Sequence, residues 1–209
     1  MNEHNILGAI LAGGKSKRMG KDKLFVNLNN KLLIEHTIIK VKKYLKELII
    51  VTNHKNEFFK KNNLVTVNDC LKGQLGPLVG ILTAMKWAKE KSTQCNWIAT
   101  FPCDTPFFPE NIITKFIEES KKKESLILCA SSHGRKHNIF GLWSLDLYDK
   151  LYNDLVNNKI RKVQDWTKEN NIKNLEFEFE DYDPFFNINT LEDLKFAKKL
   201  SLKINEQKK

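Results

Sequence analysis

The stretch Ile10-Leu11-Ala12-Gly13-Gly14-Lys15-Ser16-Lys17-Arg18-Met19-Gly20-Lys21-Asp22-Lys23 decides the fold of this chain. It continues the apolar run Ile6–Leu11, which is too short to span a membrane and is typical of a buried strand. Adjacent glycines allow positive φ angles and let a bulky ligand approach main-chain N–H groups. The cations that follow supply charge for an anionic ligand: Lys15, Lys17, Arg18, Lys21 and Lys23. A strand followed by such a loop predicts a phosphate-binding site.

A Walker-type P-loop is one alternative for this stretch, because Gly14-Lys15-Ser16 nearly completes that motif. However, Ala9 stands where the motif needs its first glycine, and the spacer residues belong mostly to the strand. Residues 16–22 also lack apolar periodicity, whereas a P-loop leads straight into a helix. An ordinary strand-to-helix turn is the other alternative, but such turns have only about 2–6 residues. The stretch therefore predicts a long basic loop that folds over a triphosphate and is anchored at Lys23.

Length and composition indicate one globular domain, expected to span residues 1–203, followed by a disordered basic tail at 204–209. A chain of 209 residues buries about 70% of its unfolded surface. The formal charge of +10 points to acidic partners such as nucleotides, phosphorylated small molecules or nucleic acid. Much of this charge is scattered over expected helix faces, and no nucleic-acid-binding module is recognisable. We therefore expect no nucleic-acid partner.

The four cysteines, Cys70, Cys95, Cys103 and Cys129, form no C-x-x-C pair and have no metal-ligand spacing. They are expected to be reduced thiols, mostly buried. The N-terminus has Glu3 where a signal peptide has basic residues, and no apolar run reaches transmembrane length. A cytoplasmic location without membrane association is the resulting expectation.

Strand and helix patterns alternate along the chain. Asn29-Asn30 is predicted to cap a helix over residues 31–45, and Gly73–Pro77 a turn that starts a helix over 78–89. Further helices are predicted at 56–62, 110–122, 145–156, about 161–169 and after 190, and strands at 48–51, 64–67, 97–101, 126–130, 139–143 (a candidate antiparallel strand) and 175–179. This order predicts a three-layer, Rossmann-like α/β fold with a mostly parallel central sheet and helices on both faces.

Polar residues follow the strands at their carboxyl ends, where ligands bind in such sheets. Asn53 and Asp69 are thereby expected at the same rim as Gly13, although each alone is also a common turn residue. Guanine presents the donors N1–H and N2–H₂ side by side, and a carboxylate can accept both. We assign this role to Asp69, with Asn53 and the main chain at Leu11 and Ala12 completing the base pocket. Cytosine lacks such a donor pair, so the arrangement favours GTP over CTP.

Pro102-Cys103-Asp104-Thr105-Pro106 follows the strand predicted at 97–101. A carboxylate braced by prolines is a suitable ligand for Mg²⁺, which binds one or two carboxylates together with phosphate oxygens and water. Asp104 is the predicted metal ligand. The alternative is that Asp104 only caps a turn before the helix expected after Pro109.

The C-terminal half offers candidates for binding a second, acidic substrate. A polar loop is predicted over residues 131–138, and its Arg135 could meet such an acceptor or simply be solvated. Asn187 and Asn189 occupy alternate positions of an extended segment, so both are expected on one side, where they could hold the metal, the phosphates or the acceptor. Their alternative role is turn formation. Thr190 and Asp193 predict a capping box for the last helix.

Leu11-Ala12-Gly13-Gly14-x-Ser16-x-Arg18-Met19-Gly20-x-Asp22-Lys23 resembles the signature of nucleotidyltransferases, and is most similar to that of the molybdenum cofactor guanylyltransferases (the MobA family). Similar runs recur at Gly76–Gly80, Pro102–Pro106 and Asn187–Thr190, so the resemblance covers nearly the whole chain. The pair His137-Asn138 departs from the family, whose members usually carry His-Pro or Gln-Pro there. The bend at this point is expected to differ.

The resemblance implies a nucleotidyltransferase fold and transfer of GMP from GTP to the terminal phosphate of molybdopterin, with release of pyrophosphate. It implies Mg²⁺ on Asp104, and Arg18 and Lys23 beside it as catalytic residues. Transient contact with cofactor-biosynthesis proteins or molybdoenzymes would follow. The nucleotide site is expected to comprise Leu11, Ala12, Gly13, Gly14, Lys23, Asn53, Asp69 and Asp104. Two alternatives remain: a transferase for molybdopterin cytidylylation or for a sugar or alditol phosphate, and a nucleotide-binding module without turnover.

Overall fold

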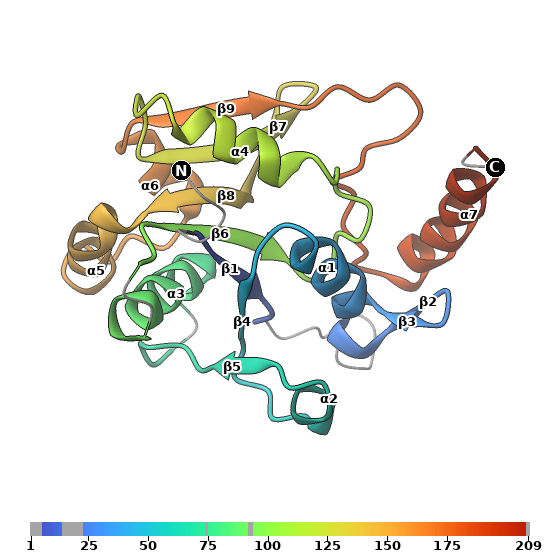
Figure 1. Cartoon of the computed structure of the whole chain (residues 1–209), viewed down its shortest axis with the longest axis horizontal. Coiled ribbons are helices and arrows are strands. Elements are labelled where there is room, and N and C mark those ends of the chain that lie inside the picture. The colour runs from blue at the N-terminus through green and yellow to red at the C-terminus, as the bar shows by residue number, and fades with distance from the viewer. Residues whose placement is uncertain (1–5, 14–22, 74, 92–93, 208–209) are drawn as a thin grey trace.

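A central sheet organises the computed structural model, which describes residues 6–13, 23–73, 75–91 and 94–207. Within these residues the sheet has seven strands in the order β5-β4-β1-β6-β8-β7-β9 (Figure 1). β8 is antiparallel to both of its neighbours, and the other pairs are parallel, which confirms the mostly parallel α/β sheet. The strands are β1 Ile6–Leu11, β4 Glu47–Val51, β5 Val65–Val67, β6 Trp97–Pro102, β7 Ile127–Ser132, β8 Arg135–Ser144 and β9 Ile172–Glu176.

Helices cover both faces of the sheet, because successive side chains of a strand point to opposite sides. In β1, Ile6 and Ile10 join one buried cluster, whereas Leu7 and Ala9 join the other. The first cluster contains side chains of α1 (Leu33–Lys42), α2 (Glu57–Lys61) and α4 (Ile112–Ser120). The second contains side chains of α3 (Pro77–Lys91), α5 (Tyr148–Val156) and α6 (Val163–Lys168). The predicted three-layer architecture is therefore confirmed.

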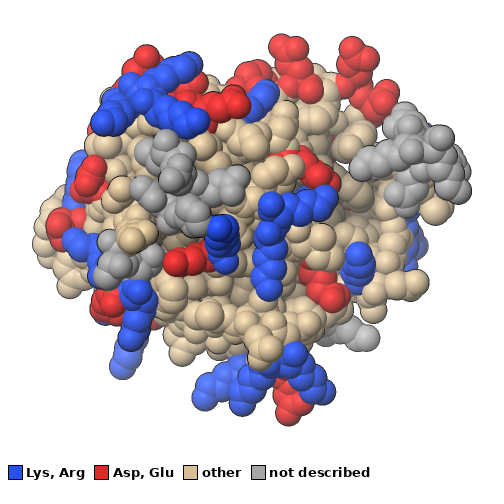
Figure 2. Space-filling model, viewed as in Figure 1, with Lys and Arg blue, Asp and Glu red and all other residues tan. Residues whose placement is uncertain are grey.

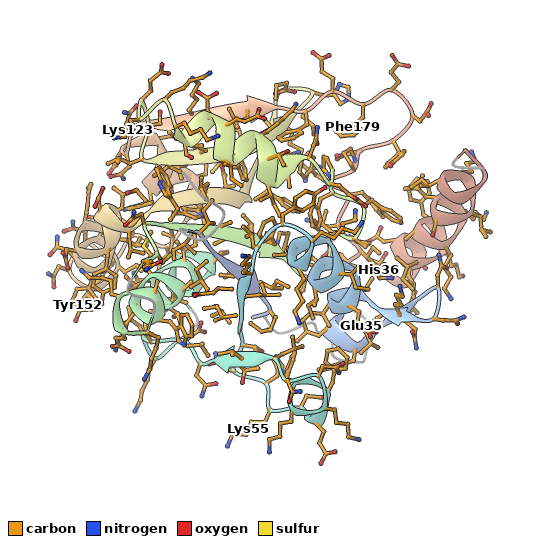
Figure 3. The ribbon with its side chains drawn as sticks, in the orientation of Figure 1. Glu35, His36, Lys55, Lys123, Tyr152 and Phe179 are labelled. Carbon is orange, nitrogen blue, oxygen red and sulfur yellow. The ribbon has the colours of Figure 1, made fainter. Side chains whose placement is uncertain are left out.

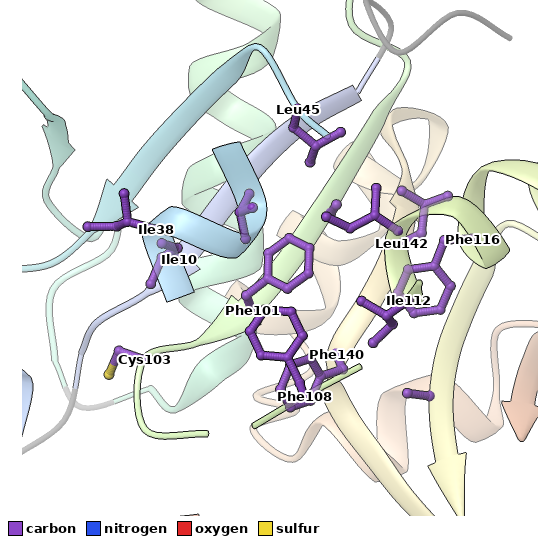
Figure 4. Close-up of a cluster of buried hydrophobic side chains, with 14 of the residues drawn as sticks. Ile10, Ile38, Leu45, Phe101, Cys103, Phe108, Ile112, Phe116, Phe140 and Leu142 are labelled. Atoms are coloured by element: carbon purple, nitrogen blue, oxygen red, sulfur yellow. The ribbon is translucent and has the colours of Figure 1, made fainter. Parts of the chain in front are cut away.

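Aromatic packing holds the end of β6 in place. The ring centroids of Phe101 and Phe108 are 5.7 Å apart, and those of Phe108 and Phe140 are 5.2 Å apart (Figure 4). Cys103 is buried in the same cluster. Such contacts between aromatic rings stabilise a core beyond the burial of their area. The backbone on either side of Asp104 is thus tied to the core.

A small hairpin replaces the predicted helix start at residues 29–30. β2 (Asn27–Leu28) pairs with β3 (Lys31–Leu32), and the 3₁₀ turn η2 (Lys23–Phe25) precedes this pair. Asn29 and Asn30 have φ angles of 52° and 63°. The N-cap prediction was wrong, because two asparagines tolerate the left-handed angles that a two-residue hairpin turn requires.

The helix that follows, α1, begins after Leu32 instead. The carboxylate of Glu35 accepts a hydrogen bond from the backbone N–H of Leu32 at 2.6 Å, and Nε2 of His36 lies 2.9 Å from the carbonyl oxygen of Leu28. Both side chains face the hairpin from α1 (Figure 3). Two neighbouring side chains therefore join the helix to the hairpin.

The predicted polar loop at 131–138 is mostly strand. β7 and β8 form an antiparallel hairpin whose turn is His133-Gly134, with φ angles of 47° and 74°. The polar side chains had suggested a loop, but each strand of a hairpin needs only backbone pairing and a turn that tolerates positive φ. The register shifts after Cys129, whose partner is Gly141, while Ala130 pairs with His137. Residues 138–140 therefore bulge out of the β7–β8 ladder.

The C-terminal segments differ from their predicted bounds. β9 ends at Glu176, before most of the predicted strand at 175–179, although the N–H of Phe177 still donates to the carbonyl of Ser131 at 2.8 Å.

The capping box is confirmed: the N–H of Thr190 donates to Asp193, and the N–H of Asp193 donates to the hydroxyl of Thr190. α7 (Leu191–Gln207) continues beyond residue 203, because its last turns contain no proline or glycine to end a helix. It stands beside the β2–β3 hairpin (Figure 1).

The surface carries mixed charge. Figure 2 shows lysine and arginine side chains spread over the visible face with acidic side chains between them. None of the described helices has both the length and the apolar character that crossing a bilayer requires. The charge on the visible face is therefore not of a single sign.

Candidate functional site

A cleft of about 1380 Å³ opens at the carboxyl ends of β1, β4, β5 and β6. From β1 the chain passes to β4 on one side, and it later returns to add β6 on the other side. This reversal of winding leaves a crevice between β1 and β6, the position where open α/β sheets bind their ligands. The topology therefore accounts for the position of the cleft.

The end of β1 forms one wall of this cleft. Leu11, Ala12 and Gly13 line it, and the N–H of Ala12 donates to the carbonyl of Val51 at 2.9 Å. The φ angle of Gly13 lies outside the left-handed region, and a Cβ there would meet no atom within 4 Å among the described residues. Gly13 therefore contributes open space and not the positive φ that the glycine pair had suggested.

Three further predicted catalytic or nucleotide-binding residues lie wholly or partly outside the described part of the chain. Gly14 and Arg18 lie outside the described residues, and so does the side chain of Lys23, whose backbone begins η2. Their roles remain predictions.

Asn53 and Asp69 meet at the ends of β4 and β5, as predicted. Nδ2 of Asn53 donates to a carboxylate oxygen of Asp69 at 2.8 Å, and the N–H of Asp69 donates to Oδ1 of Asn53 at 3.0 Å. The first bond orients the Asp69 carboxylate, and the second holds the Asn53 amide against the main chain of Asp69. A carboxylate oxygen accepts more than one hydrogen bond, so Asp69 keeps acceptor capacity for a ligand. Asn53 thus acts on the cleft through Asp69.

The glycine-rich turn before α3 closes this end of the cleft. Gly73 and Gly76 have φ angles of 110° and 76°, and Pro77 is the first residue of α3, as predicted. A Cβ on Gly76 would lie 3.2 Å from the carbonyl oxygen of Arg161, and one on Gly80 would lie 3.2 Å from the Leu11 side chain. The close approach of three segments therefore explains why glycines stand here.

Asp104 lies on the cleft wall beside β1, where its half-buried carboxylate faces the same space as Asp69. The hydroxyl of Thr105 lies 3.2 Å from Oδ1 of Asp104. The described residues contain no group of three or more His, Cys, Asp or Glu side chains arranged to hold a metal. The Asp104 carboxylate is a hard oxygen ligand, which fits Mg²⁺ when a nucleotide and water supply further oxygens.

Asn187 and Asn189 both line the cleft from the segment before α7. Ile188 between them is fully buried, whereas both asparagines are exposed, so the two amides point to one side as the alternation predicts. The oxygen of the Asn187 amide lies 2.5 Å from the Thr105 hydroxyl. The structure thus brings Asn187 to the Asp104 segment, and its role there remains a prediction.

A second wall of the cleft is basic and was only partly predicted. Arg135 lines the cleft, and one of its guanidinium nitrogens is 3.9 Å from a carboxylate oxygen of Asp183. Lys136, Arg161 and Lys162 also line the cleft. Arg161 and Lys162 were not predicted as site residues, since the start of a helix was the only pattern around them. The close approach of Gly76 to Arg161 is visible only in the fold.

The buried carboxylate of Asp154 holds the segment that contains Arg161 and Lys162. Asp154 is 5% exposed and accepts hydrogen bonds from the side chains of Lys150, Asn158 and Trp166. Burial raises the pKa of Asp154, but these bonds outweigh burial and leave the pKa lowered. A guanidinium nitrogen of Arg161 donates to the carbonyls of Leu155 and Ile160 at 2.6 and 2.9 Å. The loop before α6 is therefore held against the cleft by polar bonds.

The planar ring of His137 lines the same wall of the cleft. Its ring stacks on Phe185 with centroids 4.2 Å apart, and Nε2 lies 2.7 Å from the Ser132 hydroxyl. Burial lowers the pKa of His137, so the imidazole is neutral at pH 7. The cleft thus combines an acidic, strand-end side with a basic and aromatic side.

Comparison with known proteins gives a consistent result. A family model described as "MobA-like NTP transferase domain" matches residues 8–171. Two relatives named molybdenum cofactor guanylyltransferase are 34% identical over 94% of this chain and 96% of the relative (Mesorhizobium japonicum), and 37% identical over 91% and 96% (Haemophilus influenzae). The crystal structure of molybdopterin-guanine dinucleotide biosynthesis protein A from Archaeoglobus fulgidus has a TM-score of 0.73 at 23% identity, covering 94% of this chain and 98% of that one.

Proposed function

Because the chain belongs to the family of MobA-like NTP transferase domains, we propose that it transfers GMP from GTP to the terminal phosphate of molybdopterin. An acceptor phosphate oxygen attacks the α-phosphorus, the bond to the β-phosphate oxygen breaks, and pyrophosphate leaves. The guanylyltransferase names of relatives that match over more than nine-tenths of the chain support GTP as the donor.

The observation that carries this proposal is the placement of Asp69 and Asp104 in one cleft, at the ends of β5 and β6. Asp69, oriented by Asn53, accepts hydrogen bonds from N1–H and N2–H₂ of guanine. The main chain at Leu11–Gly13 contacts the nucleotide between the two carboxylates. Arg18 and Lys23 bind the β- and γ-phosphates and stabilise the leaving pyrophosphate.

Asp104 and its oxygen neighbours would hold Mg²⁺, and that ion, when bound, neutralises charge on the α-phosphate. The chain itself supplies mainly position: phosphoryl transfer asks little covalent chemistry of the protein. Arg135 and its basic neighbours bind the acidic acceptor, while Asn187 and Asn189 orient its phosphate. The four cysteines are free thiols, which fits a reducing compartment such as the cytoplasm.

The test is to incubate the protein with Mg²⁺, molybdopterin and either GTP or CTP, and to detect the products by mass spectrometry. We expect the guanine dinucleotide and pyrophosphate with GTP, and little product with CTP. Product from CTP alone would favour the cytidylyltransferase alternative. GTP binding without pyrophosphate release from any acceptor, including sugar and alditol phosphates, would favour a module without turnover.

The role of Asp69 is tested with Asp69→Ala. A site built on hydrogen bonds rejects an unmatched base by up to about 10⁴–10⁵-fold, so loss of the carboxylate should raise KM for GTP and weaken the preference over CTP. An unchanged KM and an unchanged base preference would remove Asp69 from base recognition.

A further inference from the structure

Thr105 joins two site residues that are far apart in the sequence. Its side chain is fully buried. The hydroxyl oxygen lies 3.2 Å from Oδ1 of Asp104 and 2.5 Å from the amide oxygen of Asn187, which is 82 residues further along the chain. A buried hydroxyl placed between a carboxylate and an amide is in a position to orient both.

The number of hydrogens available in this cluster indicates how the hydroxyl orients both groups. A threonine hydroxyl has one hydrogen and can donate to only one of the two neighbours. The Asn187 amide can present its nitrogen instead of its oxygen, because the two ends have the same shape. Nδ2 of Asn187 then donates to Oγ1 of Thr105, and Oγ1 donates to Oδ1 of Asp104. In this order every group is satisfied, and the amide oxygen of Asn187 is turned away from Thr105.

A backbone contact brings the same two segments together. The N–H of Ile188 donates to the carbonyl oxygen of Asp104 at 2.9 Å, and the Ile188 side chain is fully buried. This bond places the main chain of residue 188 and involves neither the Asp104 carboxylate nor the Asn187 amide. The Thr105 hydroxyl, in contrast, contacts both of these side chains.

We propose that Thr105 is a positioning residue, whose hydroxyl fixes the Asp104 carboxylate relative to the Asn187 amide, in the orientation in which Asp104 binds a divalent cation with its nucleotide. The inference rests on the proposed function, in which Asp104 holds the metal. Mg²⁺ demands nearly ideal octahedral geometry, so a small rotation of a ligand weakens its binding.

The test compares Thr105→Val, which removes the hydroxyl but keeps the volume, with Thr105→Ser, which keeps the hydroxyl. Loss of a partner that orients a metal ligand costs about 10–100-fold in metal affinity or activity. Thr105→Val should raise the Mg²⁺ concentration for half-maximal pyrophosphate release by this factor, with KM for GTP at saturating Mg²⁺ little changed. Thr105→Ser should stay close to the unmodified protein.

Thr167→Val is the matched control. Thr167 is 2% exposed, and its hydroxyl donates to the Gln164 carbonyl within α6. This variant loses a buried hydroxyl without touching Asp104, so its Mg²⁺ dependence should not move. If Thr105→Val fails to fold, as judged by circular dichroism, Thr105→Cys replaces it, because a thiol is only a weak donor.

Binding of Mn²⁺ in the presence of GTP, measured by electron paramagnetic resonance, separates this inference from the proposed function. Weaker Mn²⁺ binding by Thr105→Val alone supports the inference, even where the unmodified protein releases no pyrophosphate and the proposed function fails. Unchanged Mn²⁺ binding by Thr105→Val overturns it. A defect in Thr105→Ser as large as that in Thr105→Val also overturns it, since packing of the methyl group would then explain both.

Discussion

The two halves of the cleft are built in different ways. The strand-end half consists of Leu11–Gly13, Asn53, Asp69 and Asp104, which follow parallel strands. The hairpin half consists of residues 135–140, residues 161–164 and Phe185, which come from a bulged hairpin, a loop before a short helix and a C-terminal segment. Parallel strands bring their ends together by topology alone. The hairpin half has no such rule and depends on particular tertiary contacts.

The contacts that hold the two halves differ accordingly. The strand-end half rests on continuous backbone ladders, extended by the bond from Ala12 to Val51. The bulge of the hairpin half rests on a side-chain relay in which Nε1 of Trp143 donates to Oγ1 of Thr100 at 2.8 Å, and Oγ1 donates to the Ile139 carbonyl at 2.7 Å. Ladders tolerate side-chain changes, whereas a buried relay fails when one member is lost.

The largest expected effect falls on Asp104, in the strand-end half. Asp104→Asn removes the charge of the proposed metal ligand, and kcat should fall about 10³-fold, as when a group that stabilises transition-state charge is removed. Pyrophosphate release at saturating GTP measures it. Asp149→Asn, at an exposed carboxylate on α5, is the control and should leave kcat unchanged. A loss below tenfold would contradict a central role for Asp104.

A second prediction concerns the scaffold of the hairpin half. A Cβ at Gly141 would lie 2.8 Å from the indole of Trp143, which is fully buried and bonded to Thr100. Gly141→Ala should destabilise the protein by about 2 kcal/mol through overpacking. This corresponds to a fall in Tm of about 4–8 °C for a chain of this size. Thermal unfolding followed by circular dichroism is the measurement.

The stability control comes from the strand-end half. A Cβ at Gly13 would meet no described atom within 4 Å, so Gly13→Ala should leave Tm unchanged. Equal Tm values for the two variants would show that the hairpin half tolerates crowding as well as the strand ends do.

The two halves should also separate kinetically. Asn53→Ala removes the side chain that orients Asp69 and should raise KM for GTP about tenfold, the lower end of the effects seen for supporting residues. Arg135→Ala should leave the KM for GTP unchanged and raise the KM for the acceptor by a similar factor of about 10. The effect is moderate because the substitution removes one exposed cation and leaves no buried charge without its partner. Steady-state kinetics with each substrate varied in turn measures both. The same pattern in both variants would refute a division of the cleft.

The smallest effect is a pH dependence of stability. Burial lowers the pKa of His36 and of His137 below the ordinary value of 6.5. Protonation of these imidazoles therefore favours the unfolded chain. The stability that the neutral imidazoles contribute is fully present above pH 6.5 and is lost as the pH falls from there through their lowered pKa values in the folded protein. The free energy of unfolding from urea titrations at pH 7.5 and 5.5 should fall less in His36→Gln and His137→Gln than in the unmodified protein. Identical losses in all three proteins would contradict this assignment.

Prediction from the sequence succeeds where a feature has a local cause and fails where long-range pairing decides. The apolar run before Gly13, the strand endings at Asn53 and Asp69 and the capping box at Thr190 are local patterns with local causes, and the structure confirms their placement. Asn29-Asn30 and residues 131–138 were misjudged, because the same polar residues suit a helix cap, a loop or a hairpin turn. Only long-range strand pairing selects among these.

The sequence by itself determined that strands and helices alternate, that the strands carry polar residues at their carboxyl ends, and that a glycine-rich basic stretch follows the first of them. Tertiary structure alone decided that Arg161 approaches Gly76, that Asn187 reaches Thr105, and that residues 138–140 bulge into the cleft. The physical reason is range. Periodicity and turn propensity act between residues a few positions apart, whereas these contacts join segments tens of residues apart that meet only once the sheet has formed.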